Sequence, residues 1–390
     1  MIRSFLFASI LLATPALAFV SPEHKEAGDQ GFAGAVAEYQ RTENADPLAH
    51  LSGVRKDGQI FTGVGPDYKS LVGWFGFGEL VAIYGDMRAT VEELNSADSA
   101  PHVPGLKNVA ATGDYAHNKP ERDRMMELAF VNETHFSGKA LAAYVKWHDL
   151  ALTTALRRDR HWLALHYEAL GLHSLTDLFA PGHMLVDREQ TMTLLQKAGA
   201  VARAAHDELH QGMKKLLHAE WDYFRAKKDA LKAELVYGFF ANLYHNGFNF
   251  HGATVSNLRG ESWRAFGDHR LHHSENGQDL TAAQRAQLKS AVSTSVLQVL
   301  RVANHQPPPL PGHRFAALQY LPIRYRNAAT CQDLSKEKLP AVAAVFKQGR
   351  GLAKAGGLDA GLLLAKPIPD GDVAYLDEVR RHCDKACAGQ

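Results

Sequence analysis

The chain has 390 residues, with 43 Lys and Arg against 42 Asp and Glu, which gives a formal net charge of +1 at pH 7. A protein with so little net charge has no electrostatic reason to bind a large polyanion, although a small phosphorylated substrate could bind at a local cationic site. Hydrophobic residues make up 46% of the chain, which together with its length allows a large core in one or two domains.

The first 18 residues have the three parts of a secretory signal sequence: Arg3, an apolar run over 5–12, and a small-x-small cleavage site at 16–18. The apolar run is too short to span a membrane. We expect cleavage near Ala18, a mature chain that begins at Phe19, and a secreted or periplasmic protein. No later stretch has the apolar length of a membrane span, so no transmembrane segment is expected.

Apolar residues recur at three- and four-residue steps along most of the mature chain, which indicates helices. We expect helices at residues 121–130, 140–156, 162–179, 191–217, 220–244 and 282–303. Residues 45–80 and 96–119 are richer in Gly, Pro, Asp and Asn, and are expected to form long loops. Alternating strand patterns are scarce and no strand–glycine-rich loop–helix unit is present. The predicted fold is therefore all-α, a bundle of several helices.

A proline-rich stretch interrupts the helical pattern near the C-terminus. Residues 307–312 hold four prolines that cannot continue a helix, so we expect an extended connector between a helical domain at 19–306 and a C-terminal segment at 313–390. All three cysteines, Cys331, Cys383 and Cys387, lie in that segment. In an oxidising compartment they predict one disulfide, which ties the tail down, and one remaining thiol.

The most informative motif is His173, Asp177 and His183, in which the first two residues lie one helical turn apart and the third follows a Pro-Gly corner. His166, His173 and Asp177 fall within roughly 40° of one another on an ideal helix. This helix is apolar around most of its circumference and is expected at the centre of the fold. Buried His and Asp side chains without partners would cost several kcal/mol. We interpret His173, Asp177 and His183 as metal ligands, and His166 and His161 as structural residues.

Other catalytic patterns fit less well. There is no G-x-S-x-G element. The run from His206 to His210 has the four-residue spacing of the zincin motif, but Asp207 stands where that motif requires Glu directly after the first His.

The His-x3-Asp-x5-His spacing on an apolar helix resembles the superfamily of zinc-dependent phospholipase C and fungal single-strand nucleases. Members of that superfamily are secreted all-α enzymes that bind three zinc ions. The resemblance implies that the amine and carbonyl of Phe19, together with His24, bind one zinc. The family usually has Trp at this position, but the backbone supplies the ligands. An α-amino group, with a pKa of about 7.7–8.0, can be deprotonated by a metal near neutral pH.

The resemblance also implies an Asp and a His between these two ends. His135, just ahead of a long helix, matches the segment that carries the His. Asp86, which follows Gly78–Gly85, matches the acidic motif, and Asp114 is the alternative.

The last expected element is a His followed four residues later by a carboxylate. His245 with Asn249 is preferred, and His206 with His210 is the alternative. Asn249 departs from the family pattern, because a neutral amide is a weaker zinc ligand than a carboxylate. The resemblance covers roughly residues 19–268 and does not extend past residue 307.

These ligands imply three zinc ions, with Asp177 bridging two of them. The implied sets are Asp86, His135 and His173 for one ion, Phe19 and His24 for another, and His183, His245 and Asn249 for the third. Asp86 and Asp177 are the expected catalytic residues, and metal-activated water is the expected nucleophile.

The implied activity is phosphodiester hydrolysis, most specifically that of a phospholipase C on phosphatidylcholine-type lipids. Trp74–Phe77 could contact a lipid interface, pack on the core, or stack on nucleic-acid bases. A single-strand nuclease or nucleotidase is the alternative, and the preferred interpretation includes no nucleic acid because the chain lacks clusters of Lys and Arg. A non-catalytic binding protein that retains the fold is the second alternative.

Overall fold

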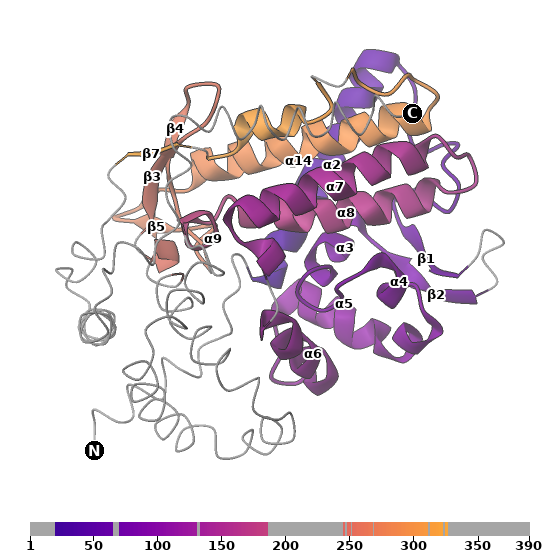
Figure 1. Ribbon diagram of the computed structural model, residues 1–390, viewed down its shortest axis with the longest axis horizontal. Coiled ribbons are helices and arrows are strands. Elements are labelled where there is room, and N and C mark those ends of the chain that lie inside the picture. The colour runs from indigo at the N-terminus through magenta and orange to yellow at the C-terminus, as the bar shows by residue number, and fades with distance from the viewer. Residues whose placement is uncertain are drawn as a thin grey trace, which may run out of the picture.

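The computed structural model (Figure 1) describes residues 20–64, 70–130, 133–185, 245, 248–250, 252–267, 269–310, 313–322 and 324–326. The described part of the chain is mostly helical, with a few short strands, as the sequence predicts. None of its helices combines the length and the apolar character that crossing a bilayer requires. The signal sequence, Phe19, the cysteines and the predicted helices at 191–217 and 220–244 lie outside the described residues.

Helix α8, His161–Asp177, lies at the centre of the fold. It packs along α7, Ser137–Ala155, and also contacts α14, Ala282–Ala303, as Figure 1 shows. The buried face of α8 extends around most of the helix, because leucines and alanines alternate there with buried His, Thr and Asp. All three helices were predicted from apolar periodicity, and α14 has the predicted bounds.

Helix α2, Ser21–Glu43, packs against α14 and against the short helix α3, Phe77–Ile83. Pro22 suits the first turn of α2, since its missing N–H is not needed there. Glu23 holds that turn in place: its Oε2 accepts from Val20 N at 3.1 Å, and its Oε1 accepts from Leu271 N at 2.8 Å. Helix α2 was not predicted from the sequence, because glycines and polar residues weaken its apolar stripe.

The expected long loop at 45–80 is wrong in part. It contains a hairpin of β1, Ile60–Val64, with β2, Ser70–Phe75, whose pairing runs from Ile60 opposite Phe75 to Val64 opposite Ser70. Phe75 and Phe77 are buried in the main core, and Trp74 lies beneath the Arg55 guanidinium at 3.9 Å. The aromatic run at 74–77 therefore packs on the core and is not an exposed apolar loop.

The expected loop at 96–119 is also wrong in part. It holds a 3-10 helix, η1, Ala97–His102, and helix α5, Val103–Thr112, which ends at Gly113 with φ +68°. Leu106, Val109 and Ala110 give α5 a buried side. A ten-residue helix has a short apolar stripe, so the surrounding Pro, Gly and Asn concealed it. Two more helices flank this segment: α4, Val91–Leu94, precedes η1, and α6, Lys119–Phe130, follows α5.

A small three-stranded sheet closes one end of the molecule, with strand order β4-β3-β7. Its strands are β3, Ala253–Ser256, β4, Ser262–Ala265, and β7, Arg324–Arg326, and a minor hairpin joins β5, Ser274–Glu275, to β6, Gln278–Asp279. After the proline-rich connector, η4, Ala316–Tyr320, packs on α14, so this part of the chain contacts the helical body again. The rest of 313–390 lies outside the described residues.

Candidate metal centre

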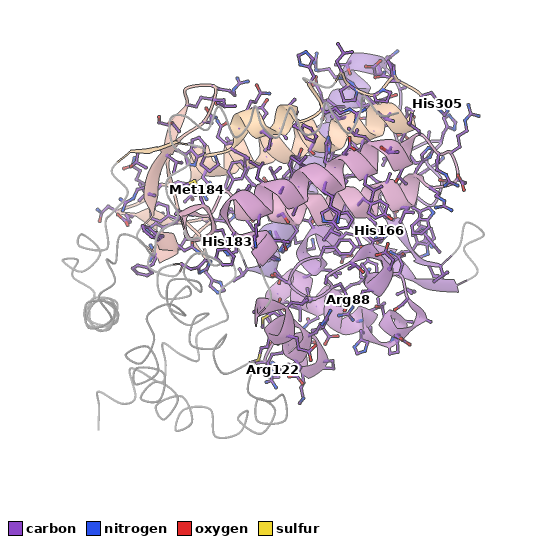
Figure 2. The ribbon with its side chains drawn as sticks, viewed as in Figure 1. Arg88, Arg122, His166, His183, Met184 and His305 are labelled. Atoms are coloured by element: carbon purple, nitrogen blue, oxygen red, sulfur yellow. The ribbon has the colours of Figure 1, made fainter. Side chains whose placement is uncertain are left out.

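Six buried ligand-type side chains converge where α8 ends. His24 comes from the first turns of α2, and Asp86 follows α3 in a turn. His173 and Asp177 occupy the last turns of α8. The remaining two are His135 on the 3-10 helix η2, Glu133–His135, and His183 on α9, Pro181–Leu185. Five elements or turns thus contribute to one place, and Figure 2 labels His183 in it.

These six residues form two groups, each of which could hold a metal ion. The first group is His24, Asp86 and His173, and the second group is His135, Asp177 and His183. Within each group the potential ligand atoms lie within 4.8 Å of one another. All six side chains are buried, so an uncompensated charge here would be costly.

Asp177 lies between the two groups. Its Oδ1 is 3.3 Å from His24 Nε2, and its Oδ2 is 2.8 Å from His135 Nδ1. The same Oδ2 is 3.6 Å from His173 Nε2 and 3.8 Å from His183 Nδ1. One buried carboxylate is therefore within 4 Å of nitrogens from four imidazoles, which is the arrangement expected of a bridging ligand.

The hydrogen bonds of His173 and His183 determine which ring nitrogen carries the proton. His173 Nδ1 donates to the Val81 carbonyl at 2.9 Å, and His183 Nδ1 donates to the His135 carbonyl at 2.6 Å. Because a carbonyl can only accept, each Nδ1 must carry the proton. In the neutral ring each Nε2 then keeps its lone pair, as a metal-binding imidazole requires.

The same reasoning applies to His24 through Thr176. The Thr176 hydroxyl donates to the His173 carbonyl at 2.8 Å, so its oxygen accepts the proton of His24 Nδ1 at 2.7 Å. His24 Nε2, which faces Asp177, is then the unprotonated nitrogen. Thr176 was not identified from the sequence. Its position directly before Asp177 carries no recognisable signal, because the contact with α2 spans 152 residues.

Burial keeps these histidines in the form that binds metals. Burial, reinforced by neighbouring His173, lowers the pKa of His24 to about 4. Burial likewise holds the pKa values of His173 and His183 well below the usual range, and nearby imidazoles add to the effect. Neutral imidazole is the metal ligand, so these side chains require no deprotonation at pH 7.

Several buried atoms in the site have no hydrogen-bond partner among the described residues. They are both carboxylate oxygens of Asp177 and the Nε2 of His183. Burial raises the pKa of Asp177 to about 6, against the opposing effect of His24. A carboxylate that faces the unprotonated nitrogens of His24 and His173 is unfavourable without a cation, and imidazole with carboxylate is the ligand combination that zinc accepts. The residues present therefore fit a metal ion.

Gly85 allows Asp86 to approach the histidines closely. Its φ is +81°, and a Cβ at this position would lie 2.2 Å from His173 Cδ2 and 2.8 Å from His135 Cε1. Both the left-handed backbone and the space thus require glycine here. The preceding helix α3 is buried over most of its length, which holds this turn against α8.

His245 and Asn249 lie beside His183 but outside both groups. The His245 and His183 rings have centroids 4.6 Å apart. Asn249 Oδ1 accepts from Gly182 N at 2.6 Å, so its amide nitrogen is the atom that faces His245 Nε2 at 3.0 Å. In this orientation Asn249 supports the Pro-Gly corner and directs a donor, not a ligand oxygen, toward His245.

The other sequence-predicted candidates lie elsewhere. Asp114 pairs with exposed His117 at 2.7 Å and lies in neither group, so the geometry favours Asp86. His166 Nε2 donates to the Phe61 carbonyl and its Nδ1 accepts from the Tyr84 hydroxyl, and Figure 2 shows His166 apart from His183. His161 Nδ1 accepts from Ser52 N. Phe19, His206 and His210 lie outside the described residues.

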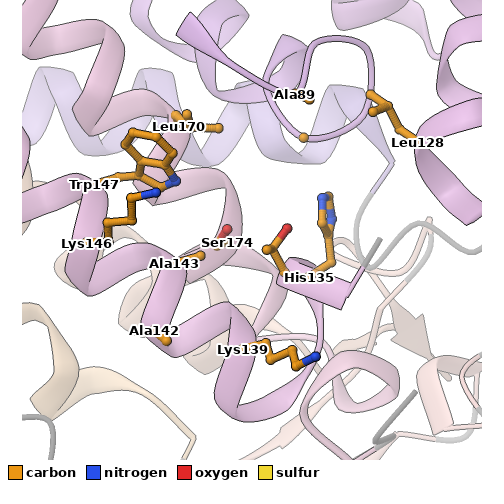
Figure 3. Close-up of a pocket in the computed structure, with 12 residues that line it drawn as sticks. Ala89, Leu128, His135, Lys139, Ala142, Ala143, Lys146, Trp147, Leu170 and Ser174 are labelled. Carbon is orange, nitrogen blue, oxygen red and sulfur yellow. The ribbon is translucent and has the colours of Figure 1, made fainter. Parts of the chain in front are cut away.

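A cavity of about 420 Å³ opens beside the two groups, as Figure 3 shows. His135, Gly85 and Ser174 form the wall that it shares with the site, and Lys139, Lys146 and Trp147 come from α7. This volume lies within the range of small-molecule pockets. No role was predicted for the two lysines: Lys146 lies within the predicted helix at 140–156, and Lys139 directly precedes it.

Comparisons with known proteins identify no relative. No family model matches the chain, and neither the curated proteins nor the solved structures include a significant match.

Proposed function

We propose that this chain is a secreted zinc-dependent phosphodiester hydrolase, released by cleavage near Ala18. The observation that carries the proposal is the buried Asp177 carboxylate, which has nitrogens of His24, His135, His173 and His183 within 3.8 Å. Hydrogen bonds to Val81 and Thr176 orient two of these rings with the unprotonated nitrogen toward the carboxylate. Such orienting hydrogen bonds are typical of metal-binding histidines.

Two zinc ions are the minimum that this geometry supports, one for each group, with Asp177 shared. The start of the described chain adds to this. Ser21 Oγ donates to Asp86 Oδ2 at 3.4 Å, and His24 lies in the first group. Phe19 directly precedes this segment in the sequence, and the segment contacts the site through Ser21 and His24. This supports the Phe19 amine as a ligand, as the resemblance implies.

A third zinc ion at His183 and His245 belongs to the same proposal. The His183 Nε2 is buried and has no hydrogen-bond partner among the described residues. Binding there requires the Asn249 amide to turn, because its oxygen accepts from Gly182 N in the present arrangement. A content of three zinc ions per chain would therefore indicate that the Asn249 amide has turned, and a content of two would indicate that it has not.

Bound zinc would supply Lewis-acid chemistry: it polarises a phosphoryl oxygen and lowers the pKa of a coordinated water toward 7. The side chains that would bind zinc are buried, so they are shielded from bulk water. His24, His173 and His183 remain neutral donors, and Asp86 and Asp177 supply the negative charge that offsets the cations. No Ser or Cys nucleophile is needed in this scheme.

Phospholipids are the proposed substrate class, following the resemblance to bacterial phospholipase C. The adjoining cavity supports a substrate group of small-molecule size next to His135. Cleavage of single-stranded nucleic acid is the competing outcome, and binding without catalysis is the third.

Metal analysis together with activity assays tests the proposal. Mature protein beginning at Phe19 is expected to contain two to three zinc ions per chain by mass spectrometry. It should hydrolyse phospholipid vesicles, whereas Asp177→Asn should lose most of its zinc and its activity. Asp114→Asn is the matched control, since Asp114 pairs with exposed His117.

Three results would contradict the proposal or redirect it. Zinc-free protein that remains zinc-free after incubation with the metal refutes it. Zinc-loaded protein that cleaves single-stranded DNA but not vesicles moves the assignment to a nuclease. Zinc-loaded protein inactive on both is a binding protein.

A further inference from the structure

The cavity beside the metal groups is lined by two lysines, and their positive charge affects which substrates it can bind. Five of its lining residues come from α7, and four of them, Lys139, Ala142, Ala143 and Lys146, share one spacing pattern. Their spacing of three, four and seven residues places them on one helical face, where two alanines separate two lysines. The lysines are two turns apart, about 10 Å along the helix axis. A cation therefore stands at each end of a small, apolar floor.

The two lysines occupy different positions relative to the metal groups. Lys139 lies in the first turn of α7, four residues after His135, and Lys146 lies two turns further on beside Trp147, as Figure 3 shows. Both side chains are exposed. A phosphate held at the metal groups would thus have Lys139 near it, and Lys146 would face whatever part of the substrate extends along the floor.

No acidic side chain lines this cavity in the part of the chain that the structure describes. The lining includes one large aromatic ring, Trp147, and it already has neighbours. Lys146 Nζ lies 4.2 Å from its centroid, and Tyr167 stacks parallel to it at 5.9 Å. Quaternary ammonium groups are recognised by aromatic faces and carboxylates. This cavity presents ammonium groups instead, so it disfavours a choline headgroup.

We infer that the cavity selects phosphodiester substrates that carry a second negative charge, which Lys146 receives. The inference rests on the proposed phosphodiesterase function and replaces the phosphatidylcholine preference expected from the resemblance. The second charge is a carboxylate or phosphate, and its source is an anionic lipid headgroup or a nucleotide. Exposed Lys–anion pairs are individually weak, so the expected preference is roughly three- to ten-fold.

Two substrate pairs distinguish the sources. The lipid pair is short-chain phosphatidylserine against phosphatidylcholine with the same acyl chains. The nucleotide pair is the thymidine dinucleotide with and without a 5′-phosphate. Within the pair that the enzyme cleaves, the more anionic member should have the higher kcat/KM. Lys146→Glu should abolish or reverse that ratio. The matched control is Lys289→Glu, an equal charge change at an exposed position of α14 outside the cavity.

Equal rates within the cleaved pair, or a ratio that Lys146→Glu leaves unchanged, overturn the inference while the proposed function stands. If neither pair is cleaved, the proposed function fails, and binding decides the inference. Calorimetry with O-phosphoserine and O-phosphoethanolamine then compares two ligands that differ only in a carboxylate. The inference requires tighter binding of phosphoserine in the unmodified protein and no such preference in Lys146→Glu. Equal binding refutes it.

Discussion

A buried ion pair away from the metal groups offers the sharpest test of how this fold is held together. His148 on α7 and Glu168 on α8 are both fully buried, with Nδ1 2.7 Å from Oε2. On the other side of the ring, His148 Nε2 lies 2.9 Å from the Arg314 carbonyl and 3.1 Å from Gln298 Oε1. All of these oxygens accept, so His148 must carry both protons and a positive charge.

A chain of hydroxyls completes the network on the Glu168 side. Ser295 on α14 donates to Glu168 Oε1 at 2.5 Å, and Tyr144 OH lies 2.8 Å from Ser295 Oγ. Burial by itself would lower the pKa of His148, but the charge and hydrogen bond of Glu168 outweigh it and raise that pKa. The pair therefore joins α7, α8, α14 and the segment after the proline-rich connector.

Glu168→Gln keeps the shape and removes the charge. Breaking a buried ion pair by removing one partner costs about 3–5 kcal/mol, because the other charge stays buried without compensation. We expect a loss of this size in the free energy of unfolding at pH 6, measured by urea titration with circular dichroism. Glu38→Gln is the matched control: Glu38 also pairs with a cation, Arg41, but is exposed. Its urea midpoint should not change.

The loss should depend on pH in a defined direction. A histidine whose pKa is raised on folding contributes stability below its unfolded pKa of about 6.5, and that contribution is lost as pH rises through the folded pKa. The difference between the unmodified protein and Glu168→Gln should therefore be largest near pH 6 and smaller at pH 9. A loss below about 1 kcal/mol, or one equal at both pH values, would refute the buried ion pair.

Three further predictions concern the metal groups. Gly85→Ala should lower the zinc content, because the added Cβ would lie 2.2 Å from His173 Cδ2. Gly260→Ala is the control, because Gly260 has the same φ of +81° but nothing within 4 Å of an added Cβ, so this variant should keep its zinc. Equal zinc content in both variants would contradict the steric argument. Thr176→Val removes the acceptor of the His24 Nδ1 proton and should weaken zinc binding about 10–100-fold in a chelator competition. Thr153→Val, on an exposed hydroxyl of α7, should leave the affinity unchanged, and the same affinity in both variants would exclude this role for Thr176. A short peptide retained before Phe19 should remove about one zinc ion per chain and the activity, as measured by metal analysis and hydrolysis, whereas full zinc and activity would exclude the terminal amine as a ligand.

Local patterns in the sequence determined the helical class of this protein and the core of its candidate site. Apolar periodicity located α7, α8 and α14, because their buried faces repeat every three or four residues. The four-residue step from His173 to Asp177 placed both on one side of α8 for the same reason. Shorter or more polar helices, such as α2 and α5, were missed because their burial depends on contacts with distant segments.

Only the tertiary structure decided which distant residues join that core and in what state. Asp86 reaches the histidines because Gly85 allows a turn of the chain to approach α8, whereas Asp114 remains beside an exposed histidine. The tautomer of His24 depends on Thr176, a contact across 152 residues that no local pattern encodes. The lysine face of α7 became informative once the cavity beside it was known. Helical spacing determines which side chains share a face, but packing determines what that face meets.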